Sequence, residues 1–174
     1  MSTMVIVYWT QTGNTEAMAN AIAEGAKAGG ADVSVFSVSD ISPKQALSCD
    51  LIALGCPAMG DEVLEENEFE PFFAELEGDL KGKKTALFGS YGWGDGQWMR
   101  DWQERTTADG ARLYQGEGLI LNEAPDDAGL ETCREFGRGF AMLHSAMPQS
   151  KKRSEYFFAN TEVRVEADKS ASNT

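Results

Sequence analysis

Neutral hydrogen-bond donors gather in residues 10–15, directly after the apolar run at residues 4–9. Thr10, Thr12 and Thr15 carry hydroxyl donors, and Gly13 allows a ligand to approach the main chain closely. Asn14 adds an amide donor. The segment leads into a helical pattern, so free N–H groups and the positive end of a helix dipole should face the same point. These features predict a site for an anion such as a phosphate.

The kinds of residue that are missing from this segment narrow the choice of anion. A triphosphate with magnesium usually binds a Gly-x-x-x-x-Gly-Lys-Ser/Thr loop, and a dinucleotide usually binds Gly-x-Gly-x-x-Gly after the first strand. Neither pattern is present at residues 10–15, which contain no lysine or arginine. Neutral donors suit a single phosphate that is tethered to a larger ligand. The alternative is an ordinary polar loop whose threonine or asparagine caps the helix.

Two further loops place aromatic and soft apolar side chains after predicted strands, at residues 56–62 and 90–96. Trp93 stands between two glycines, so it has no local packing partner and could support a flat ring. Met59 could contact the opposite face of that ring. Ligands of open α/β sheets bind beyond the carboxyl ends of the strands. We therefore expect a clamp for a planar heterocycle, although Trp93 could be a stray exposed aromatic and Met59 a core residue.

Alternating strand and helix patterns position these loops. Continuous apolar runs, typical of strands that are covered on both faces, predict strands at residues 4–8, 51–55 and 85–89, with others at 33–38 and 119–122. Apolar residues at helical spacing predict helices around residues 18–26, 69–76, 98–102 and 130–143. This alternation indicates an α/β domain with a parallel sheet.

Composition excludes several classes of protein. The 174 residues form one predicted domain, 1–146, followed by a polar tail, 147–174. No apolar run is long enough for a membrane helix, and no signal peptide is apparent. Three cysteines at unrelated spacings and one histidine suggest a reduced, cytoplasmic protein without a metal site. The net charge is −13, and residues 50–80 contain ten acids and no base, so a basic protein is a better partner than nucleic acid or an anionic membrane.

Three segments together resemble the flavodoxins, in particular the short-chain type of anaerobic bacteria. They are YWTQTGNTE, GCPAMGDEVLEENEFEPF and FGSYGWGDGQWMRDW, in the same order as in that family, and the resemblance covers about residues 4–146. It implies a doubly wound, five-stranded parallel sheet of order 2-1-3-4-5 with non-covalently bound FMN. It further implies a monomeric, low-potential one-electron carrier that shuttles between semiquinone and hydroquinone and is not an enzyme. Its partners would be redox proteins with basic docking surfaces.

The resemblance also implies roles for individual residues. Residues 10–15 would hold the FMN phosphate, Met59, Gly60 and Glu62 would line the ring, and Trp93 would stack on its outer face. Glu62 would meet the N3–H of the ring. The full set of implied binding residues is Thr10, Gln11, Thr12, Gly13, Asn14, Thr15, Met59, Gly60, Asp61, Glu62, Ser90, Tyr91, Gly92, Trp93, Gly94, Asp95 and Asn122. Pro57 departs from the family pattern and could remove one donor near the phosphate.

Gly60, Trp93 and the neighbouring acids would tune the redox potentials. Gly60 can turn its carbonyl toward the N5–H of the semiquinone because a glycine tolerates positive φ. The neighbouring acids would oppose the anionic hydroquinone and lower its potential; they are Asp61, Glu62, Glu65, Glu66 and Asp95. A solvated helix face is the simpler explanation of these acids.

Two other functions stay open from the sequence. An FMN-dependent NAD(P)H:quinone reductase uses the same fold, but its nicotinamide or quinone pocket usually comes from added loops and a tetramer, and no added loop is expected inside the core. A signalling receiver domain needs an acid at one strand end and a lysine at another. Cys56 and Ser90 occupy the ends of the third and fourth predicted strands, which argues against a receiver domain.

Overall fold

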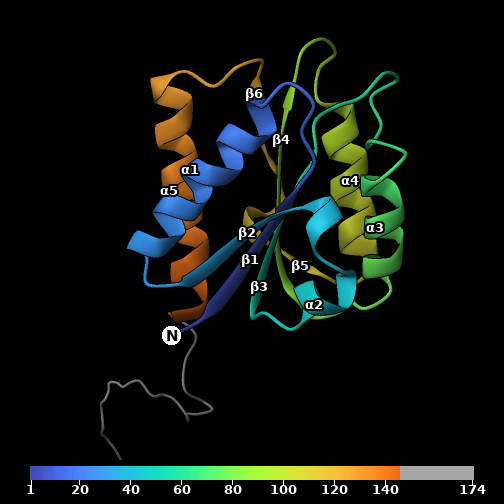
Figure 1. The fold of residues 1–174 in the computed structure, drawn as a ribbon. Helices are drawn as coiled ribbons and strands as arrows, with labels where there is room; N and C mark the ends of the chain where they lie inside the picture. Colours follow the sequence, from blue (N-terminus) through green and yellow to red (C-terminus); the bar gives the residue numbers. More distant parts are fainter. Residues whose placement is uncertain (146–174) are drawn as a thin grey trace, which may run out of the picture. The chain divides into compact units, whose positions relative to one another are not determined.

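Six parallel strands form one sheet in the order β2-β1-β3-β4-β5, with β6 also paired to β4 (Figure 1). This computed structural model describes residues 1–145, so the predicted tail at 147–174 lies outside the described residues. The strands are β1 (Thr3–Tyr8), β2 (Asp32–Ser37), β3 (Leu51–Gly55), β4 (Lys84–Tyr91), β5 (Arg112–Leu113) and β6 (Leu119–Asn122). The α-helices are α1 (Asn14–Ala28), α2 (Pro43–Leu47), α3 (Phe69–Glu77), α4 (Gln97–Ala108) and α5 (Asp127–Ser145).

The predicted strand order is confirmed, but two short strands share its fifth position. β5 pairs with the start of β4, and β6 pairs with its end. Between them, residues 114–118 leave the sheet through a 3₁₀ turn, Tyr114–Gly116, in which Gln115 has a φ of 62°. The strand predicted at residues 119–122 is confirmed as β6, whereas the short strand β5 was not predicted. The two residues of β5 are too few to show a strand pattern in the sequence.

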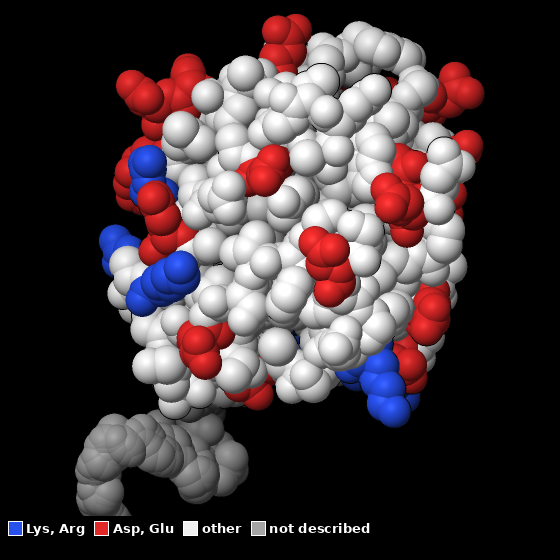
Figure 2. All heavy atoms as spheres, viewed as in Figure 1, with Lys and Arg blue, Asp and Glu red and all other residues white. Residues whose placement is uncertain are grey.

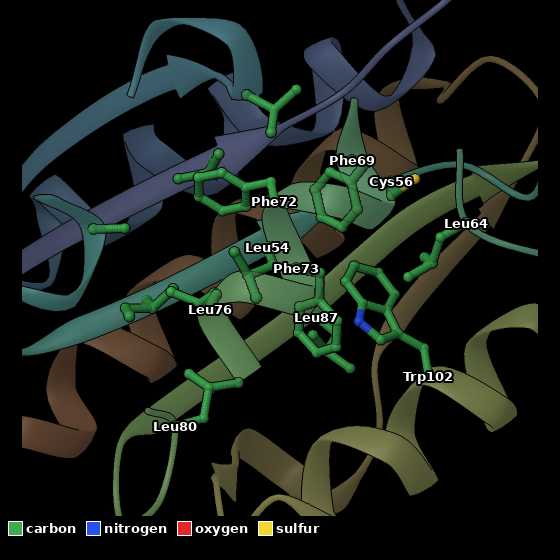
Figure 3. Close-up of a cluster of buried hydrophobic side chains, with 14 of the residues drawn as sticks. Leu54, Cys56, Leu64, Phe69, Phe72, Phe73, Leu76, Leu80, Leu87 and Trp102 are labelled. Atoms are coloured by element: carbon green, nitrogen blue, oxygen red, sulfur yellow. The ribbon is translucent and has the colours of Figure 1, made fainter. Parts of the chain in front are cut away.

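The central strands are buried on both faces because helices cover both sides of the sheet. Alternate side chains of β1 serve different layers: Met4 and Ile6 pack with α1 and α5, whereas Val5 and Val7 pack with α3 and α4. Figure 3 shows part of the second layer, where Phe69, Phe73 and Trp102 meet over β3 and β4. This double cover explains the continuously apolar sequences of β1, β3 and β4.

Glycines let α1 and α5 touch through their main chains. A Cβ atom at Gly25 would collide with the carbonyl group of Arg134, and one at Gly137 would collide with the carbonyl group of Ile22. Larger residues would force the helices apart, because protein interiors have little free volume. These contacts fix the distance between α1 and α5, and α1 carries the loop at residues 10–15 at its N-terminus.

On the other face, Arg105 joins α4 to α3. Its guanidinium donates to both oxygens of Glu70 at 2.9 and 2.7 Å and to Glu77 at 2.6–3.2 Å, and it lies 4.8 Å from the centre of the Phe73 ring. Each of these helices follows a loop that was predicted to bind the ligand. The ion pairs therefore hold together α3 and α4, the two helices that follow these loops.

Candidate functional site

A cavity of about 220 Å³ lies at the carboxyl edge of the sheet, where the loops after β1, β3 and β4 converge. Its lining residues are Thr10, Gln11, Thr12, Asn14, Thr15, Pro57, Ala58, Met59, Ser90, Tyr91, Gly92 and Glu123. All three predicted binding segments thus contribute to one cavity. Pro57, which was expected near the phosphate, also lines the cavity, and Ala58 and Glu123 are lining residues that the sequence did not predict.

The predicted phosphate loop ends at an uncapped helix. Gly13 is the N-cap of α1 with a φ of 96°, and no side chain in the described part of the chain caps this helix. The Gly13 N–H donates to the Thr10 hydroxyl at 3.1 Å, which closes the loop on itself. The first N–H groups of α1 therefore remain available to a ligand, as an anion site at a helix N-terminus requires. This neutral donor set fits the phosphate of FMN.

A buried pair of hydroxyl groups joins this loop to the sheet. Thr15 and Ser90 are 1% and 5% exposed, and their hydroxyl oxygens lie 3.0 Å apart. Either hydroxyl can donate to the other, which leaves the second hydrogen free for another acceptor. The pair fixes the start of α1 against the end of β4.

Main-chain hydrogen bonds continue the sheet into the floor of the cavity. The Trp9 N–H donates to Gly55 O at 3.0 Å, and the Ala58 N–H donates to Ser90 O at 3.0 Å. Beyond β6, the Glu123 N–H donates to Tyr91 O at 2.7 Å. Neighbouring strands therefore position the loop residues directly.

The turn that carries Gly60 is closed by a pair of hydrogen bonds. The N–H of Met59 donates to Val63 O at 3.0 Å, and the N–H of Val63 donates to Met59 O at 3.2 Å. Gly60 and Glu62 both have positive φ, of 29° and 55°. Gly60, Asp61 and Glu62 do not line the cavity, and their contacts with FMN stay predictions.

Glu62 connects this turn to the loop before α4. Its carboxylate lies against Gly94, where an added Cβ would be 2.7 Å from Cδ, and accepts a hydrogen bond from the Trp98 N–H at 3.4 Å. A carboxylate at the first turn of α4 is favourable because the helix dipole is positive there. Trp93, in the same loop, is 69% exposed and does not line the cavity, so its stacking role also stays a prediction.

Asn122 holds the same loop from the side of β6. Its amide donates to the carbonyl oxygens of Tyr91 and Gly92, each at 3.2 Å. The next residue, Glu123, lines the cavity instead and has a φ of 58°. The sequence predicted Asn122 as a binding residue and did not predict Glu123.

The structure gives Glu65 a capping role that the sequence did not predict. Its side chain is buried, and its carboxylate accepts hydrogen bonds from the N–H groups of Asn67, Glu68 and Phe69 at 2.8–2.9 Å. Burial raises the pKa of Glu65, but these three bonds outweigh burial and lower it overall. Glu65 caps the start of α3, whereas the neighbouring Glu66 is exposed as expected. These bonds join Glu65 to residues two to four positions later in the chain, so the cap is a local turn.

Negative charge dominates the face drawn in Figure 2, where acids are spread widely and the few bases lie near its margins. Within residues 1–145, no group of three or more histidines, cysteines or acids could hold a metal ion. None of the helices described is long and apolar enough to span a membrane.

Comparison with known proteins identifies the family. The model of the flavodoxin family matches residues 6–137. Flavodoxin from Clostridium beijerinckii is 52% identical over 140 residues, which cover 80% of this chain and 100% of the relative. Flavodoxin from Megasphaera elsdenii is 52% identical over 136 residues, 78% of this chain and 96% of the relative. The solution structure of its two-electron reduced form has a TM-score of 0.73 at 51% identity, covering 80% of this chain and 98% of that one. The chain therefore belongs to the flavodoxin family of FMN-binding electron carriers.

Proposed function

We propose that this flavodoxin binds FMN in the cavity at the carboxyl edge of its sheet and acts as a low-potential one-electron carrier. The observation that carries the assignment of the site is the uncapped N-terminus of α1 in a cavity that also includes Met59 and Tyr91. The neutral donors of this lining suit a phosphate, and its apolar and aromatic groups suit a flavin ring. The comparisons do not favour the quinone reductase alternative.

The residues divide between the two ends of the cofactor. Thr10–Thr15 would bind the phosphate through hydroxyl, amide and main-chain donors, with Ser90 supporting Thr15. Met59 and Trp93 would enclose the ring, while Glu62 would accept from its N3–H. Tyr91, Gly92, Gly94 and Asp95 would shape the side nearest the sugar chain, and Asn122 would position that loop through its bonds to Tyr91 and Gly92.

When bound, FMN supplies the one-electron redox chemistry. The Gly60 carbonyl would accept a hydrogen bond from flavin N5 and so hold a proton there. The paired bonds between Met59 and Val63 would keep that carbonyl on a defined turn. The nearby carboxylates of Asp61, Glu62, Glu66 and Asp95 would oppose further negative charge on the ring.

Partner proteins are inferred from charge. We expect redox proteins with basic docking surfaces, because opposite charges accelerate and orient encounter. The protein would act as a monomer in such exchanges. Its apolar contacts for a partner would include Trp93 and Val63, which are 69% and 41% exposed.

An absorbance spectrum during stepwise anaerobic reduction tests the function directly. The purified protein should be yellow and should pass through a distinct one-electron species before it bleaches. A single two-electron bleach would move the assignment toward an enzyme, and a colourless protein that does not bind added FMN would reject the flavin site.

A matched pair of variants tests the site itself. Thr12→Val removes one hydroxyl from the cavity and should weaken FMN binding up to about tenfold, since a neutral hydrogen bond contributes about 0.5–1.5 kcal/mol. Thr132→Val, on the exposed face of α5, is the control. Equal FMN affinities in the two variants would place the phosphate elsewhere.

A further inference from the structure

Trp98, in the first turn of α4, holds the loop that follows β3 at both of its ends. The side chain is buried, with 1% of its surface exposed, and its indole N–H donates to Cys56 O at 3.1 Å. Its main-chain N–H donates to the Glu62 carboxylate at 3.4 Å. Cys56 and Glu62 are the first and last residues of the loop at 56–62, whose middle part lines the cavity. One residue of α4 therefore ties this loop to the helix.

The ring of Trp98 also supports the loop that follows β4. Its centre lies 5.7 Å from the centre of the Tyr91 ring, and Tyr91 lines the cavity. Gly89 allows this arrangement, because a Cβ atom there would lie 3.1 Å from the Trp98 ring and would collide with Cys56 O. Trp98 does not line the cavity itself, but it contacts both of the loops that supply Met59 and Tyr91 to the cavity.

We propose that Trp98 is a positioning residue for the cofactor ring, and that its indole bond to Cys56 O keeps Gly60 in place. This inference rests on the proposed function, because it assumes that the Gly60 carbonyl accepts a hydrogen bond from flavin N5. The bonds between Met59 and Val63 set the shape of the turn, whereas the bonds from Trp98 set its place relative to β3 and α4. The positive φ of Glu62 also needs support from its surroundings.

Trp102 offers a matched comparison one turn later in the same helix. It is 2% exposed and packs edge-on against Phe69 and Phe73 (Figure 3). Its Nε1 atom is buried and has no hydrogen-bond partner within the described residues. Trp98→Phe and Trp102→Phe therefore remove the same atoms from the same apolar layer, but only Trp98→Phe removes a hydrogen bond to the loop.

The test measures both one-electron potentials of the FMN-bound protein by anaerobic potentiometric titration, and FMN affinity by calorimetry. Trp98→Phe should narrow the separation of the potentials by about 59 mV, which corresponds to a tenfold change for one electron. FMN affinity should fall about tenfold, because the loop must then be ordered during binding. Trp102→Phe should change neither quantity. A potential moves only when FMN loses affinity unequally in its redox states, so a loosened fold alone would not narrow the separation.

A second replacement removes the hydrogen bond without leaving a cavity. 3-Benzothienylalanine incorporated at position 98 keeps the double ring and has sulfur in place of the N–H group. It should narrow the separation of the potentials as Trp98→Phe does, and it provides the same test if Trp98→Phe does not fold. Narrowing in Trp98→Phe but not in the benzothienylalanine protein would overturn the role of the indole bond, because lost packing would then be the cause.

The other outcomes separate this inference from the proposed function. Weaker FMN binding with unchanged potentials in Trp98→Phe would overturn the inference, since Trp98 would then support only the fold. Equal narrowing in Trp98→Phe and Trp102→Phe would overturn it in favour of the general packing of α4. If the unmodified protein binds FMN and both replacements at position 98 match it, only this inference fails. If the unmodified protein binds no FMN, the proposed function fails.

Discussion

Gly60 combines a φ of 29° with open space around the position of a Cβ atom. A side chain there would strain the backbone without colliding with any neighbour, because no atom lies within 4 Å. We expect Gly60→Val to disfavour the carbonyl orientation that would accept a hydrogen bond from flavin N5. The separation between the two one-electron potentials should then narrow by tens of millivolts, since about 59 mV corresponds to a tenfold change. Anaerobic potentiometric titration measures both potentials.

Gly78→Ala is a suitable control for this experiment. Gly78 also has open space around it, but its φ is −64° and it lies at the C-cap of α3. Its substitution should leave both potentials unchanged. If the two one-electron potentials are equally far apart in Gly60→Val and in Gly78→Ala, Gly60 does not tune the cofactor.

Glu65 and Glu66 are adjacent acids with different structural roles. Because Glu65 accepts three main-chain hydrogen bonds, Glu65→Gln should lower the free energy of unfolding at pH 7 by about 1–3 kcal/mol. Glu66 is exposed, so Glu66→Gln should change the free energy of unfolding by less than about 0.5 kcal/mol. Urea unfolding of the two variants provides the comparison, and equal stabilities would contradict the capping role.

The lowered pKa of Glu65 gives this comparison a pH dependence. An acid whose pKa is depressed in the folded state stabilises the protein above its ordinary value of 4.5, and this contribution disappears as the pH falls through the folded pKa. The difference between Glu65→Gln and the unmodified protein should therefore shrink in strong acid.

At the scale of elements, the contact of α3 with α4 gathers several acids around one guanidinium. Asp109 follows α4, its Oδ2 atom is buried without a hydrogen-bond partner in the described structure, and burial and then Glu77 raise its pKa to about 6. Glu77 shifts the other way, chiefly because Arg105 donates to it. The ionised form of Asp109 is thus unfavourable beside α3 at neutral pH.

Replacing Asp109 should make this helix contact more stable. A raised pKa in the folded state means that stability is greatest below the ordinary value of 3.8 and falls as the pH rises through about 6. Asp109→Asn should therefore increase the free energy of unfolding at pH 7 by about 1–2 kcal/mol, with little gain below pH 4. Thermal unfolding at both pH values measures this, with the exposed Asp79→Asn as the control. A gain of the same size at both pH values would exclude titration of Asp109 as the cause.

The packing of the elements explains which of them could be predicted from the sequence. The runs that became β1, β3 and β4 were recognisable because helices cover both faces of these strands. The cradle at residues 10–15 was recognisable because its donors are neighbours in the chain. By contrast, β5 and α2 are too short for periodicity. Glu65 caps α3 through a local turn that has no helical pattern, and Glu123 lines the cavity only because the folded chain brings it there.

At the scale of the whole molecule, the net charge of −13 should govern how partners approach. We expect the rate of electron transfer to a redox protein with a basic docking surface to fall about tenfold or more between low and physiological ionic strength. Stopped-flow kinetics can measure this rate. A neutral small-molecule oxidant should show little dependence on salt, and an equally flat response with the protein partner would contradict electrostatic steering.

The hydrogen bonds that Trp9, Ala58 and Glu123 donate to neighbouring strand ends have a consequence for the entropy of binding. The main chain at these points loses its freedom when the sheet forms, so ordering it is part of the cost of folding and not of ligand capture. A flavin arriving at this edge has chiefly the exposed turn at residues 60–63 and the segment at residues 92–96 left to immobilise. More of the interaction free energy therefore remains as affinity, which is the advantage of a preorganised site.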